Sequence, residues 1–356
     1  MVKIVITTGG TGGHIYPALS VAKEFQKRGH EVTFVGSSSR MEKDLVPKFG
    51  IKFIGLNIRP GKSIKNIISI LFLILHCIKY ISRENPDVII GFGNYISFPM
   101  ICAAFIKRKK IYLQEQNASI GMTNKLFYRF AEKVFLAFNS TFEELPIKFQ
   151  NKFKVTGNPL REEIYKINKQ EEREKLKVSP DEKILVITGG SLGAKSINEA
   201  VAKYWDELEN KKGLRIYWAT GTKNYEDILK DLEIKNVNHV VKPYFDNLIN
   251  VMAAADLIIC RAGALTISEI IQLEKPSILI PYNSVKVGQY ENAMILKEAG
   301  GALIYNDKEV DEAIETALEI LESENILHKM GNNVKNLKTN NATKTIVDTI
   351  EIWRNN

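Results

Sequence analysis

The sequence contains the same local pattern twice: an apolar run that ends in threonine, a cluster of glycines, and a segment with helical character. The first copy, KIVITTGGTGGHIYPAL, begins at Lys3, and the second, KILVITGGSLGAKSINEA, begins at Lys183. Glycines at such a turn let backbone N–H groups approach an oxygen-rich ligand, and the amino end of the following helix adds partial positive charge. Each half of the chain is therefore expected to begin with a strand, a turn and a helix suited to phosphate or sugar hydroxyls.

Short apolar runs typical of strands alternate with longer helical patterns, which indicates βαβ units on parallel sheets. In the first half the runs are Lys3–Thr7, Glu31–Val35, Lys52–Gly55, Val88–Gly91, Ile111–Gln114, Lys133–Ala137 and Lys154–Thr156. They restart at Ile184–Thr188, Arg215–Ala219, His239–Lys242, Leu257–Cys260 and Ser277–Ile280. At 356 residues the chain also exceeds the size at which one core keeps growing. We predict two similar α/β halves, joined near Asn158–Glu163.

The charge is divided unequally between these halves. Residues 1–158 hold 23 Lys and Arg against 10 Asp and Glu, whereas the remainder holds 26 against 31. The excess peaks between Leu45 and Arg83, a stretch without any acidic residue. Such a surface attracts an anionic partner, either nucleic acid or the headgroups of a membrane. No nucleic-acid-binding motif accompanies the charges, which favours the membrane.

Two features predict a cytoplasmic protein. The chain enters a β-run at Val2, where a signal peptide would have a charged region followed by an apolar one. Its three cysteines, Cys77, Cys102 and Cys260, are far apart and lie in apolar runs. This pattern indicates reduced, buried thiols, and neither a disulfide framework nor a metal site.

Neither glycine loop matches a better-known nucleotide-binding motif. Counted from Gly10, a dinucleotide fingerprint requires Gly or Ala at the position of Ile15. In the second loop, Ala194 stands where a P-loop requires glycine. No Asp-x-Asp motif occurs in the sequence. A diphosphate leaving group is therefore expected to be neutralised by helix termini, hydroxyls and arginine, without a protein-held metal.

Three polar features of the first half are candidates for chemistry. His14 closes the first glycine loop in the first turn of a helix, whose dipole favours the neutral imidazole that a general base requires. A packing role is the alternative for His14. Gln114, Glu115 and Asn117 follow a strand whose end faces the ligand crevice of an open sheet, so they are candidates for contacts with sugar hydroxyls or are a plain polar loop. A third glycine turn, GFGNYISFP, begins at Gly91.

Two further candidates lie at the junction and in the second half. In TGNPLR, Arg161 is a fixed cation that can bind a diphosphate with two parallel hydrogen bonds. In CRAGALTISEI, Thr266 and Glu269 form a T-x-x-E pattern, which is typical of a capping box at the start of a helix. Alternatively, Glu269 chelates a ribose diol, and the turn before it covers the sugar and phosphates.

The segment IKNIISILFLILHCIKY, from Ile64 to Tyr80, raises the question of a membrane. Its uninterrupted apolar part is shorter than the roughly 20 residues of a spanning helix, so we do not expect it to span. It predicts an amphipathic helix that lies on an anionic bilayer, although a buried helix fits the periodicity equally well. The basic cluster Lys107–Lys110 favours the surface. The candidate membrane patch comprises Ile68, Phe72, Leu75, Ile78, Phe105, Lys62, Lys65 and Lys79.

Six ordered motifs over nearly the whole chain resemble the MurG family of bacterial glycosyltransferases. They are GGTGGHIYPAL, MEKDLVP, QEQNASIGMTNK, GNPLR, GGSLGA and CRAGALTISE. This family adds N-acetylglucosamine (GlcNAc) from UDP-GlcNAc to lipid I, the undecaprenyl-pyrophosphate-linked muramyl peptide of the cell wall. The resemblance implies a GT-B fold, in which two Rossmann-like domains with parallel sheets face each other across an interdomain cleft.

The resemblance also implies how the domains divide the work. It implies an acceptor- and membrane-binding domain at 1–158, a UDP-GlcNAc-binding domain at 159–338, and a helix at 339–356 that returns to the first domain. The implied partners are UDP-GlcNAc, lipid I, the anionic inner face of the cell membrane, to which the protein attaches peripherally, and proteins of cell-wall synthesis. Nucleic acid is not among them, and no cofactor is implied.

Residues that match the family's motifs acquire roles by the same resemblance. Those implied for the donor are Ser191 and Arg161 at the diphosphate, the Phe245 backbone at the uracil, Glu269 at the ribose, Ala264, Leu265 and Thr266 along the phosphate turn, and Thr11, Asn117 and Gln289 at the GlcNAc. Those implied for the acceptor are Gly10, Thr11, Gly12, Gly13 and Tyr95. In the implied inverting reaction, the C4 hydroxyl of the muramyl sugar attacks the anomeric carbon as UDP leaves. His14 is the first choice for its deprotonation, and Glu115 is the second catalytic candidate.

Four positions depart from the family's pattern. Gln114 replaces a histidine, Gly288 replaces a longer polar residue before Gln289, and Asn94 and Phe98 replace glycines of the third turn. Because Gln114 cannot transfer a proton, His14 gains weight as the base. Two alternatives stay open: another GT-B enzyme that uses a UDP-sugar, such as a glycolipid synthase or a UDP-GlcNAc epimerase, and a non-enzymatic membrane-binding scaffold.

Overall fold

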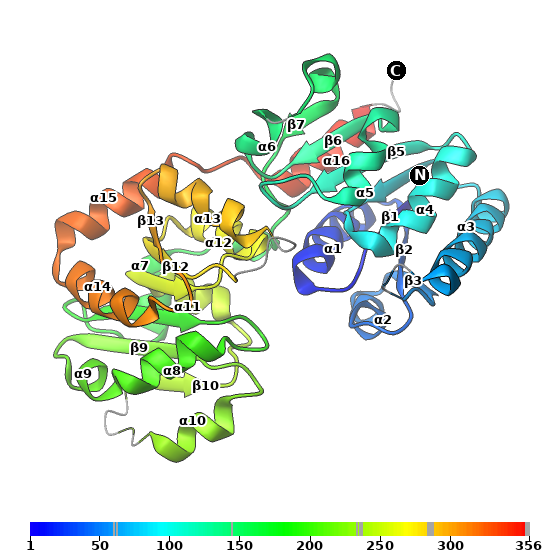
Figure 1. Cartoon of the computed structure of the whole chain (residues 1–356). Coiled ribbons are helices and arrows are strands. Elements are labelled where there is room, and N and C mark those ends of the chain that lie inside the picture. Colours follow the sequence, from blue (N-terminus) through cyan, green and yellow to red (C-terminus); the bar gives the residue numbers. More distant parts are fainter. Residues whose placement is uncertain are drawn as a thin grey trace. The chain divides into compact units, whose positions relative to one another are not determined.

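The computed structural model describes residues 1–352 except 60, 62, 144, 233, 235–237 and 283–287. The chain divides into two compact units (Figure 1). Unit 1 comprises residues 1–162 and 339–356, and unit 2 comprises residues 163–338. Each unit is a parallel sheet flanked by helices, which confirms the predicted α/β class with two Rossmann-like halves.

Unit 1 is built on a seven-stranded parallel sheet with the order β3-β2-β1-β4-β5-β6-β7. The strands are β1 (Lys3–Thr7), β2 (Glu31–Ser37), β3 (Lys52–Leu56), β4 (Val88–Gly91), β5 (Lys110–Glu115), β6 (Lys133–Leu136) and β7 (Phe153–Val155). Helices cover both faces, so the strands read as nearly continuous apolar runs. That is why the sequence located all seven of them.

The helices of unit 1 include one from the far end of the chain. They are α1 (Gly12–Lys27), α2 (Glu42–Leu45), α3 (Ile64–Glu84), α4 (Asn94–Ile106), α5 (Met122–Phe127), α6 (Asn139–Glu143) and α16 (Ala342–Ile352), with 3-10 turns η1 (Val46–Phe49), η2 (Tyr128–Phe130) and η3 (Ile147–Lys152). Helix α16 packs on α1 and adds Ile346, Val347 and Ile350 to the core under that helix. Arg28 at the end of α1 binds Asp348 and Glu351 of α16, at 2.6 and 2.7 Å.

Unit 2 has a six-stranded parallel sheet with the order β10-β9-β8-β11-β12-β13. The strands are β8 (Lys183–Thr188), β9 (Leu214–Ala219), β10 (Val240–Lys242), β11 (Leu257–Cys260), β12 (Ser277–Leu279) and β13 (Ala302–Ile304). The helices are α7 (Lys169–Lys175), α8 (Lys195–Lys203), α9 (Trp205–Asn210), α10 (Tyr225–Asp231), α11 (Leu248–Ala254), α12 (Ala264–Leu273), α13 (Gln289–Glu298), α14 (Val310–Glu322) and α15 (Glu324–Lys335), and η4 (Glu162–Tyr165) precedes them.

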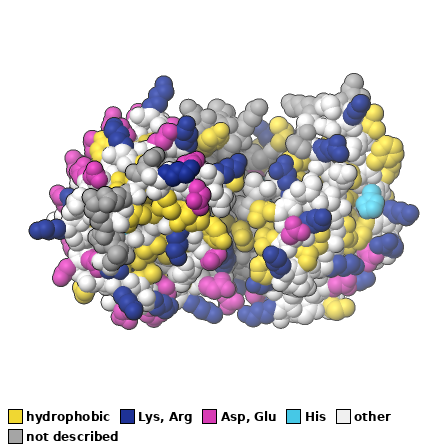
Figure 2. All heavy atoms as spheres, turned by 90° about the horizontal axis from the view of Figure 1, so that it is seen from below, with side chains coloured by type: hydrophobic (Ala, Val, Ile, Leu, Met, Phe, Trp, Pro, Cys, Tyr) yellow, Lys and Arg dark blue, Asp and Glu magenta, His cyan; other side chains and the backbone are white. Residues whose placement is uncertain are grey.

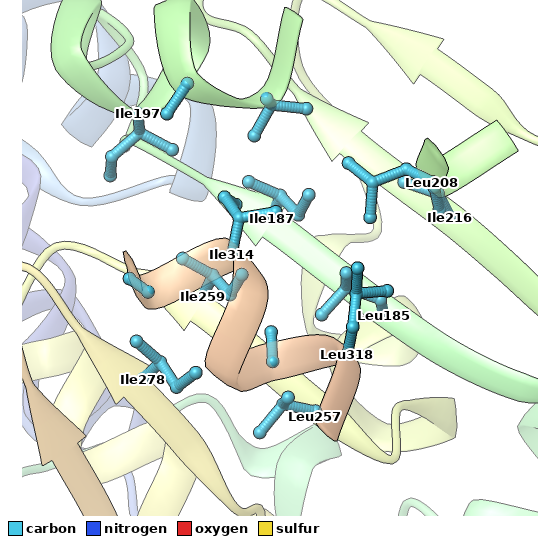
Figure 3. Close-up of a cluster of buried hydrophobic side chains, with 14 of the residues drawn as sticks. Leu185, Ile187, Ile197, Leu208, Ile216, Leu257, Ile259, Ile278, Ile314 and Leu318 are labelled. Atoms are coloured by element: carbon cyan, nitrogen blue, oxygen red, sulfur yellow. The ribbon is translucent and has the colours of Figure 1, made fainter. Parts of the chain in front are cut away.

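The core of unit 2 lies between the sheet and helices α8 and α14. Figure 3 shows Ile187 of β8, Ile259 of β11 and Ile314 of α14 pointing toward one another. Strand β13 was not among the predicted strands. It has only three residues and follows Gly300 and Gly301, so its apolar run is too short to stand out from the preceding turn.

The strand order of both sheets reverses at a position that matters for ligands. In unit 1, β2 and β3 extend the sheet on one side of β1, whereas β4 and the strands after it extend the sheet on the other side. In unit 2, β9 and β10 lie on one side of β8, and β11 and the strands after it lie on the other. Loops that follow two such strands diverge and leave a crevice at the carboxyl edge of the sheet, where open α/β folds bind ligands. The glycine turns after β1, β4, β8 and β11 all lie at these points.

Helix α3 is longer than its uninterrupted apolar run suggests. The prediction that this segment is too short to span a membrane is therefore wrong as regards its length. It has 21 residues, and it is the one helix in the described part of the chain that is long and apolar enough to cross a bilayer by length and composition. One face nevertheless belongs to the core of unit 1, where Cys77, Tyr80 and Ile81 are buried. Crossing a bilayer would remove these side chains from the core, so α3 is a surface helix of the α/β layer with one face packed into the core.

Candidate functional site

Unit 2 contains a cavity of about 590 Å³ at the carboxyl edge of its sheet. The glycine turn after β8 forms one wall and contributes Ser191. Thr266 and Glu269 of α12 and Gln289 of α13 line the cavity as well. Four of the residues expected to bind the donor, distant in sequence, are thus brought to one cavity at the switch point of the sheet.

The turn after β11 differs from the capping-box prediction. Helix α12 begins at Ala264 with Gly263 as its N-cap, and no side chain caps it. Thr266 is therefore in the first turn of the helix, so the capping-box prediction is wrong. Thr266 and Glu269 both line the cavity, which is the position that the alternative, a contact of Glu269 with a ribose, requires.

Gln289 is the first residue of α13, and its side chain is fixed by the backbone. Its Oε1 accepts a hydrogen bond from the N–H of Tyr282 at 2.8 Å. The preceding residue, Gly288, has φ 65°, in the left-handed region that favours glycine. The departure at Gly288 therefore suits the local backbone, in which a longer side chain would be strained.

Three other residues of unit 2 that were expected at the donor do not occur among the described residues that line the cavity. These are Ala264, Leu265 and Phe245. The ring of Phe245, after β10, lies 6.1 Å from the ring of Tyr217. Apolar walls come instead from Leu248 and Met252 of α11.

The cavity also contains a charged cluster that the sequence did not reveal. Arg261, at the end of β11, donates through Nη2 to Asp307 at 2.7 Å and to Ser196 at 3.2 Å, and Nη1 donates to the carbonyl of Ile280. Ser196 in turn donates to Asp307 at 2.5 Å. Burial alone would raise the pKa of Asp307, but the hydrogen bonds from Arg261 and Ser196 lower it. The guanidinium of Arg261 is thus held in the cavity wall by three oxygen partners, one of them a carboxylate.

In unit 1, the first glycine loop leads directly into α1 and places His14 in its first turn. Thr11 is the N-cap, and its Oγ1 lies 3.1 Å from Nδ1 of His14. Burial lowers the pKa of the half-buried His14 to about 4, so the imidazole is neutral at physiological pH. The neutral tautomer that donates Nδ1–H to Thr11 leaves the lone pair on Nε2, as a general base requires.

The N–H of Gly10 is not available to a ligand, unlike the expectation for this residue. It donates to both carboxylate oxygens of Glu42, at 3.2 and 3.3 Å. The loop carries Thr11, Gly12 and Gly13 beyond this point, at the amino end of a 16-residue helix. An anion at this end of the helix would interact favourably with the helix dipole.

Glu115 is buried and occupied by its own loop. One oxygen accepts from the backbone and side-chain nitrogens of Asn117, at 3.1 and 3.2 Å. The other accepts from the N–H of Gly121 and from Asn124, both at 2.8 Å. Burial raises the pKa of Glu115, and these hydrogen bonds oppose that effect. Both oxygens of Glu115 are therefore engaged with Asn117, Gly121 and Asn124, and its catalytic role stays a prediction.

Gln114 also differs from the expectation of a sugar contact. Its side chain is fully buried and joins the end of β5 to the junction of the halves, because Nε2 donates to Asn158 at 3.0 Å. Its Oε1 accepts from Gln116 at 2.5 Å. Gln114 is thus part of an amide network beneath the loop and does not reach the surface.

The third glycine turn meets the first one. Asn94, the first residue of α4, has φ 67° and donates to the carbonyl of Gly9 at 3.0 Å. Tyr95 follows it and is half-buried. Phe98 points away from the turn, with its ring 5.7 Å from that of Phe127 in the core, so it does not obstruct the turn. Arg161 is exposed in unit 1, and its guanidinium lies 4.6 Å from the centre of the Tyr16 ring of α1.

The outer face of α3 exposes the apolar side chains of the candidate membrane patch. Ile68, Phe72 and Leu75 are 48, 67 and 60% exposed, and Phe105 of α4 is 42% exposed. Lys65 and Lys79 are exposed on the same helix, whereas Ile78 is half-buried against the core and Lys62 lies outside the described residues. Figure 2 shows hydrophobic side chains gathered among lysines and arginines at the right-hand edge of the molecule.

Two parallel α/β units, with glycine turns at the switch point of each sheet and a cavity at the carboxyl edge of the second, have the GT-B fold of nucleotide-sugar glycosyltransferases. Family models agree in both halves. Residues 4–136 match the glycosyltransferase family 28 N-terminal domain, and residues 184–348 match its C-terminal domain. The chain belongs to glycosyltransferase family 28 and, within it, to the MurG family.

Individual relatives support this assignment over the full length. The UDP-N-acetylglucosamine--N-acetylmuramyl-(pentapeptide) pyrophosphoryl-undecaprenol N-acetylglucosamine transferase of Fusobacterium nucleatum subsp. nucleatum is 54% identical over 100% of this chain and 99% of its own. The crystal structure of MurG from Acinetobacter baumannii superimposes with a TM-score of 0.82 at 28% identity, covering 99% of both chains. A UDP-GlcNAc 2-epimerase from Neisseria meningitidis, solved with bound UDP-GlcNAc, shares the fold alone, with a TM-score of 0.66 at 18% identity over 98% of this chain and 99% of its own.

Proposed function

We propose that this protein transfers GlcNAc from UDP-GlcNAc to the C4 hydroxyl of the muramyl sugar of lipid I, with inversion at the anomeric carbon. The product is lipid II, an intermediate of peptidoglycan synthesis. The observation that carries the proposal is the full-length similarity of this chain to transferases that are named for this reaction. The chain also has a cavity lined by residues expected to bind the donor, and a histidine at the first glycine loop.

Unit 2 would bind the donor. The cavity offers a carboxylate, Glu269, to the two ribose hydroxyls, and hydroxyl groups at Ser191 and Thr266. The amino end of α8 and the guanidinium of Arg261 would offset the negative charge of the diphosphate. These groups would stabilise the diphosphate most strongly as UDP leaves, because the negative charge on the diphosphate then increases.

Unit 1 would bind the acceptor and supply the base. The amino end of α1 would hold the acceptor's diphosphate through the N–H groups that follow Gly10. Nε2 of His14 would accept the proton of the C4 hydroxyl as that oxygen attacks the anomeric carbon. Asn117, held by Glu115, would hydrogen-bond the GlcNAc.

The same unit would hold the enzyme on the inner face of the cell membrane, where a polyprenyl acceptor is anchored. The exposed residues of α3 provide an apolar face, and Lys65 and Lys79 lie near it. An apolar face sinks into the headgroup region, while lysines attract anionic lipids. This attachment is peripheral, because the opposite face of α3 stays in the core.

UDP release from UDP-GlcNAc, followed with and without a polyprenyl-diphosphate muramyl-peptide acceptor, tests the proposed function. The proposal requires release that depends on the acceptor. An epimerase, which the shared fold keeps as the alternative, would convert UDP-GlcNAc without any acceptor. Turnover of the donor alone, or no release with an acceptor that a MurG relative uses, would refute the proposed function.

A further inference from the structure

Glu42, the acidic residue of the MEKDLVP motif, has no part in the reaction described so far. We propose that Glu42 is a positioning residue, which holds the first glycine loop in the shape that presents Thr11 and His14 to the acceptor. The inference rests on the proposed function. It identifies a residue that affects the kinetics with the acceptor although it contacts neither substrate.

The carboxylate of Glu42 ties together two loops at the carboxyl edge of the sheet. The side chain is fully buried, with 0% exposure. Oε1 accepts from the N–H of Ser37 at 2.8 Å, at the end of β2. Both oxygens also accept from the N–H of Gly10, after β1. One buried anion therefore fixes the start of the glycine loop against the neighbouring strand.

The glycines around Glu42 leave the space that its side chain fills. A Cβ on Gly9 would lie 2.0 Å from Oε1 of Glu42 and 2.7 Å from its Cδ. A Cβ on Gly36 would lie 2.8 Å from its Cγ. All three distances are shorter than real Cβ contacts, so Gly9, Gly36 and Glu42 form one closely packed group. The first glycine of the loop thus serves an internal carboxylate and not a ligand.

The charge of Glu42 matters as well as its shape. A buried carboxylate is stable only when donors satisfy it, and its bonds to N–H groups are stronger than those of a neutral acceptor. Gly10 stands two residues before the start of α1 and four before His14. Loss of the anion would free the loop at Gly10 and let Thr11 and His14 leave the geometry that they share.

Three substitutions separate charge from shape. Glu42→Gln keeps the size but replaces one acceptor oxygen by a donor, Glu42→Asp keeps the charge on a shorter side chain, and Glu42→Ala removes both. As the matched control we choose Val134→Ala, a truncation of a fully buried residue in the other core of unit 1, which lowers stability without touching the loop. All variants are full-length chains, compared at a temperature well below the lowest Tm.

The expected result is a loss confined to the acceptor side. For Glu42→Gln and Glu42→Ala, kcat/KM for the polyprenyl-diphosphate acceptor should fall by about tenfold or more, because small misplacements of reacting groups are costly. Glu42→Asp should lose less of kcat/KM for the acceptor than these two variants do. The rise in Tm caused by UDP should stay as in the wild type, because the donor cavity is built from unit 2 and UDP carries no GlcNAc for Thr11 to contact. Acceptor kinetics equal to those of Val134→Ala would overturn the proposal, and if Glu42→Ala does not fold, the Gln and Asp variants decide.

Two readouts keep this inference separate from the proposed function. Hydrogen exchange at residues 9–15 needs no turnover, and it should be faster in Glu42→Gln than in both the wild type and Val134→Ala; unchanged exchange would overturn the proposal.

Gly9→Ala should impair acceptor use in the wild type but add little in the Glu42→Ala background, where the obstructing carboxylate is gone. Simple additivity of these two substitutions would contradict the proposed packing. An inactive wild type would count against the proposed function, and the exchange experiment would still be decisive for Glu42.

Discussion

Oγ1 of Thr11 and Nδ1 of His14 lie 3.1 Å apart, so the N-cap of α1 and a residue of its first turn form one hydrogen-bonded pair. This contact holds the orientation of the imidazole, and burial, which lowers the pKa of His14, keeps the ring neutral. In the tautomer whose Nδ1–H donates to Thr11, Nε2 is the basic nitrogen beside the loop that would hold the acceptor.

His14→Ala should lower kcat by about a hundredfold or more, in the range that general bases contribute, with donor affinity changed less than twofold. Thr11→Val should have a smaller effect of the same kind, because the imidazole would keep its basicity but lose its orientation. Steady-state kinetics in both substrates, with titration of UDP, check these expectations. A loss of UDP affinity in His14→Ala that equals the loss in kcat would contradict the role.

The lowered pKa of His14 predicts a pH effect on stability. Its folded pKa of about 4 lies below the ordinary value of 6.5, so between these values the unfolded chain binds a proton that the folded chain does not. The contribution is therefore complete above pH 6.5 and is lost as pH falls toward 4. Chemical denaturation at pH 7 and pH 5 should show a larger loss of unfolding free energy in the wild type than in His14→Gln. Equal losses would mean that the imidazole is not desolvated.

Glu269→Gln should weaken binding of UDP and UDP-GlcNAc by about tenfold, since a charged acceptor of two ribose hydroxyls becomes a neutral one. Calorimetric titration measures this directly. A matched control is the same titration with 2′,3′-dideoxy-UDP, which should bind the wild type and the variant alike. If the variant discriminated between the two nucleotides as strongly as the wild type does, Glu269 would not be the ribose ligand.

Asp307→Asn should raise the KM for UDP-GlcNAc severalfold with little change in the KM for the acceptor. The reason is that Arg261 loses the partner that fixes its guanidinium in the cavity wall. Arg261→Lys keeps the charge but cannot make the same set of bonds to Ile280, Ser196 and Asp307, so it should behave similarly. An unchanged donor KM in both variants would show that this cluster serves only the fold.

The exposed face of α3 can be tested by triple replacement of Ile68, Phe72 and Leu75 with serine, which should reduce binding to anionic vesicles by about tenfold or more. Lys65→Gln with Lys79→Gln should reduce binding mainly at low salt, because charge attraction is screened. Neither set touches the buried face of the helix. Vesicle co-sedimentation gives the result, and unchanged binding of the triple variant would remove α3 from the membrane contact.

The sequence predicted the parallel sheets well because buried strands carry continuous apolar runs that end in glycine turns. The glycine turns also placed His14, Ser191, Thr266 and Glu269 beyond the ends of predicted strands, whereas Gln289 was implied only by the family resemblance. The prediction from sequence failed where a local pattern had two meanings. The T-x-x-E of Thr266 and Glu269 resembles a capping box, yet α12 begins at Ala264.

Other features depend on contacts between residues far apart in the chain. Arg261 and Asp307 are 46 positions apart, and Glu42 and Gly10 are 32 apart, so no local spacing reveals either pair. From its position after a strand, Glu115 is a candidate for contacts with sugar hydroxyls, and it is also the second catalytic candidate. Only the four hydrogen bonds from its own loop show that its oxygens are already engaged.

The structure of the glycolipid product decides whether this chain makes lipid II. UDP-GlcNAc labelled with ¹³C in the sugar should be incubated with the purified chain and a polyprenyl-diphosphate muramyl-peptide acceptor, and the product examined by NMR. We predict that one labelled GlcNAc becomes attached to C4 of the muramyl sugar in the β configuration, with one UDP released for each product. A label that stays on the nucleotide, an α linkage, or attachment at another hydroxyl would contradict it.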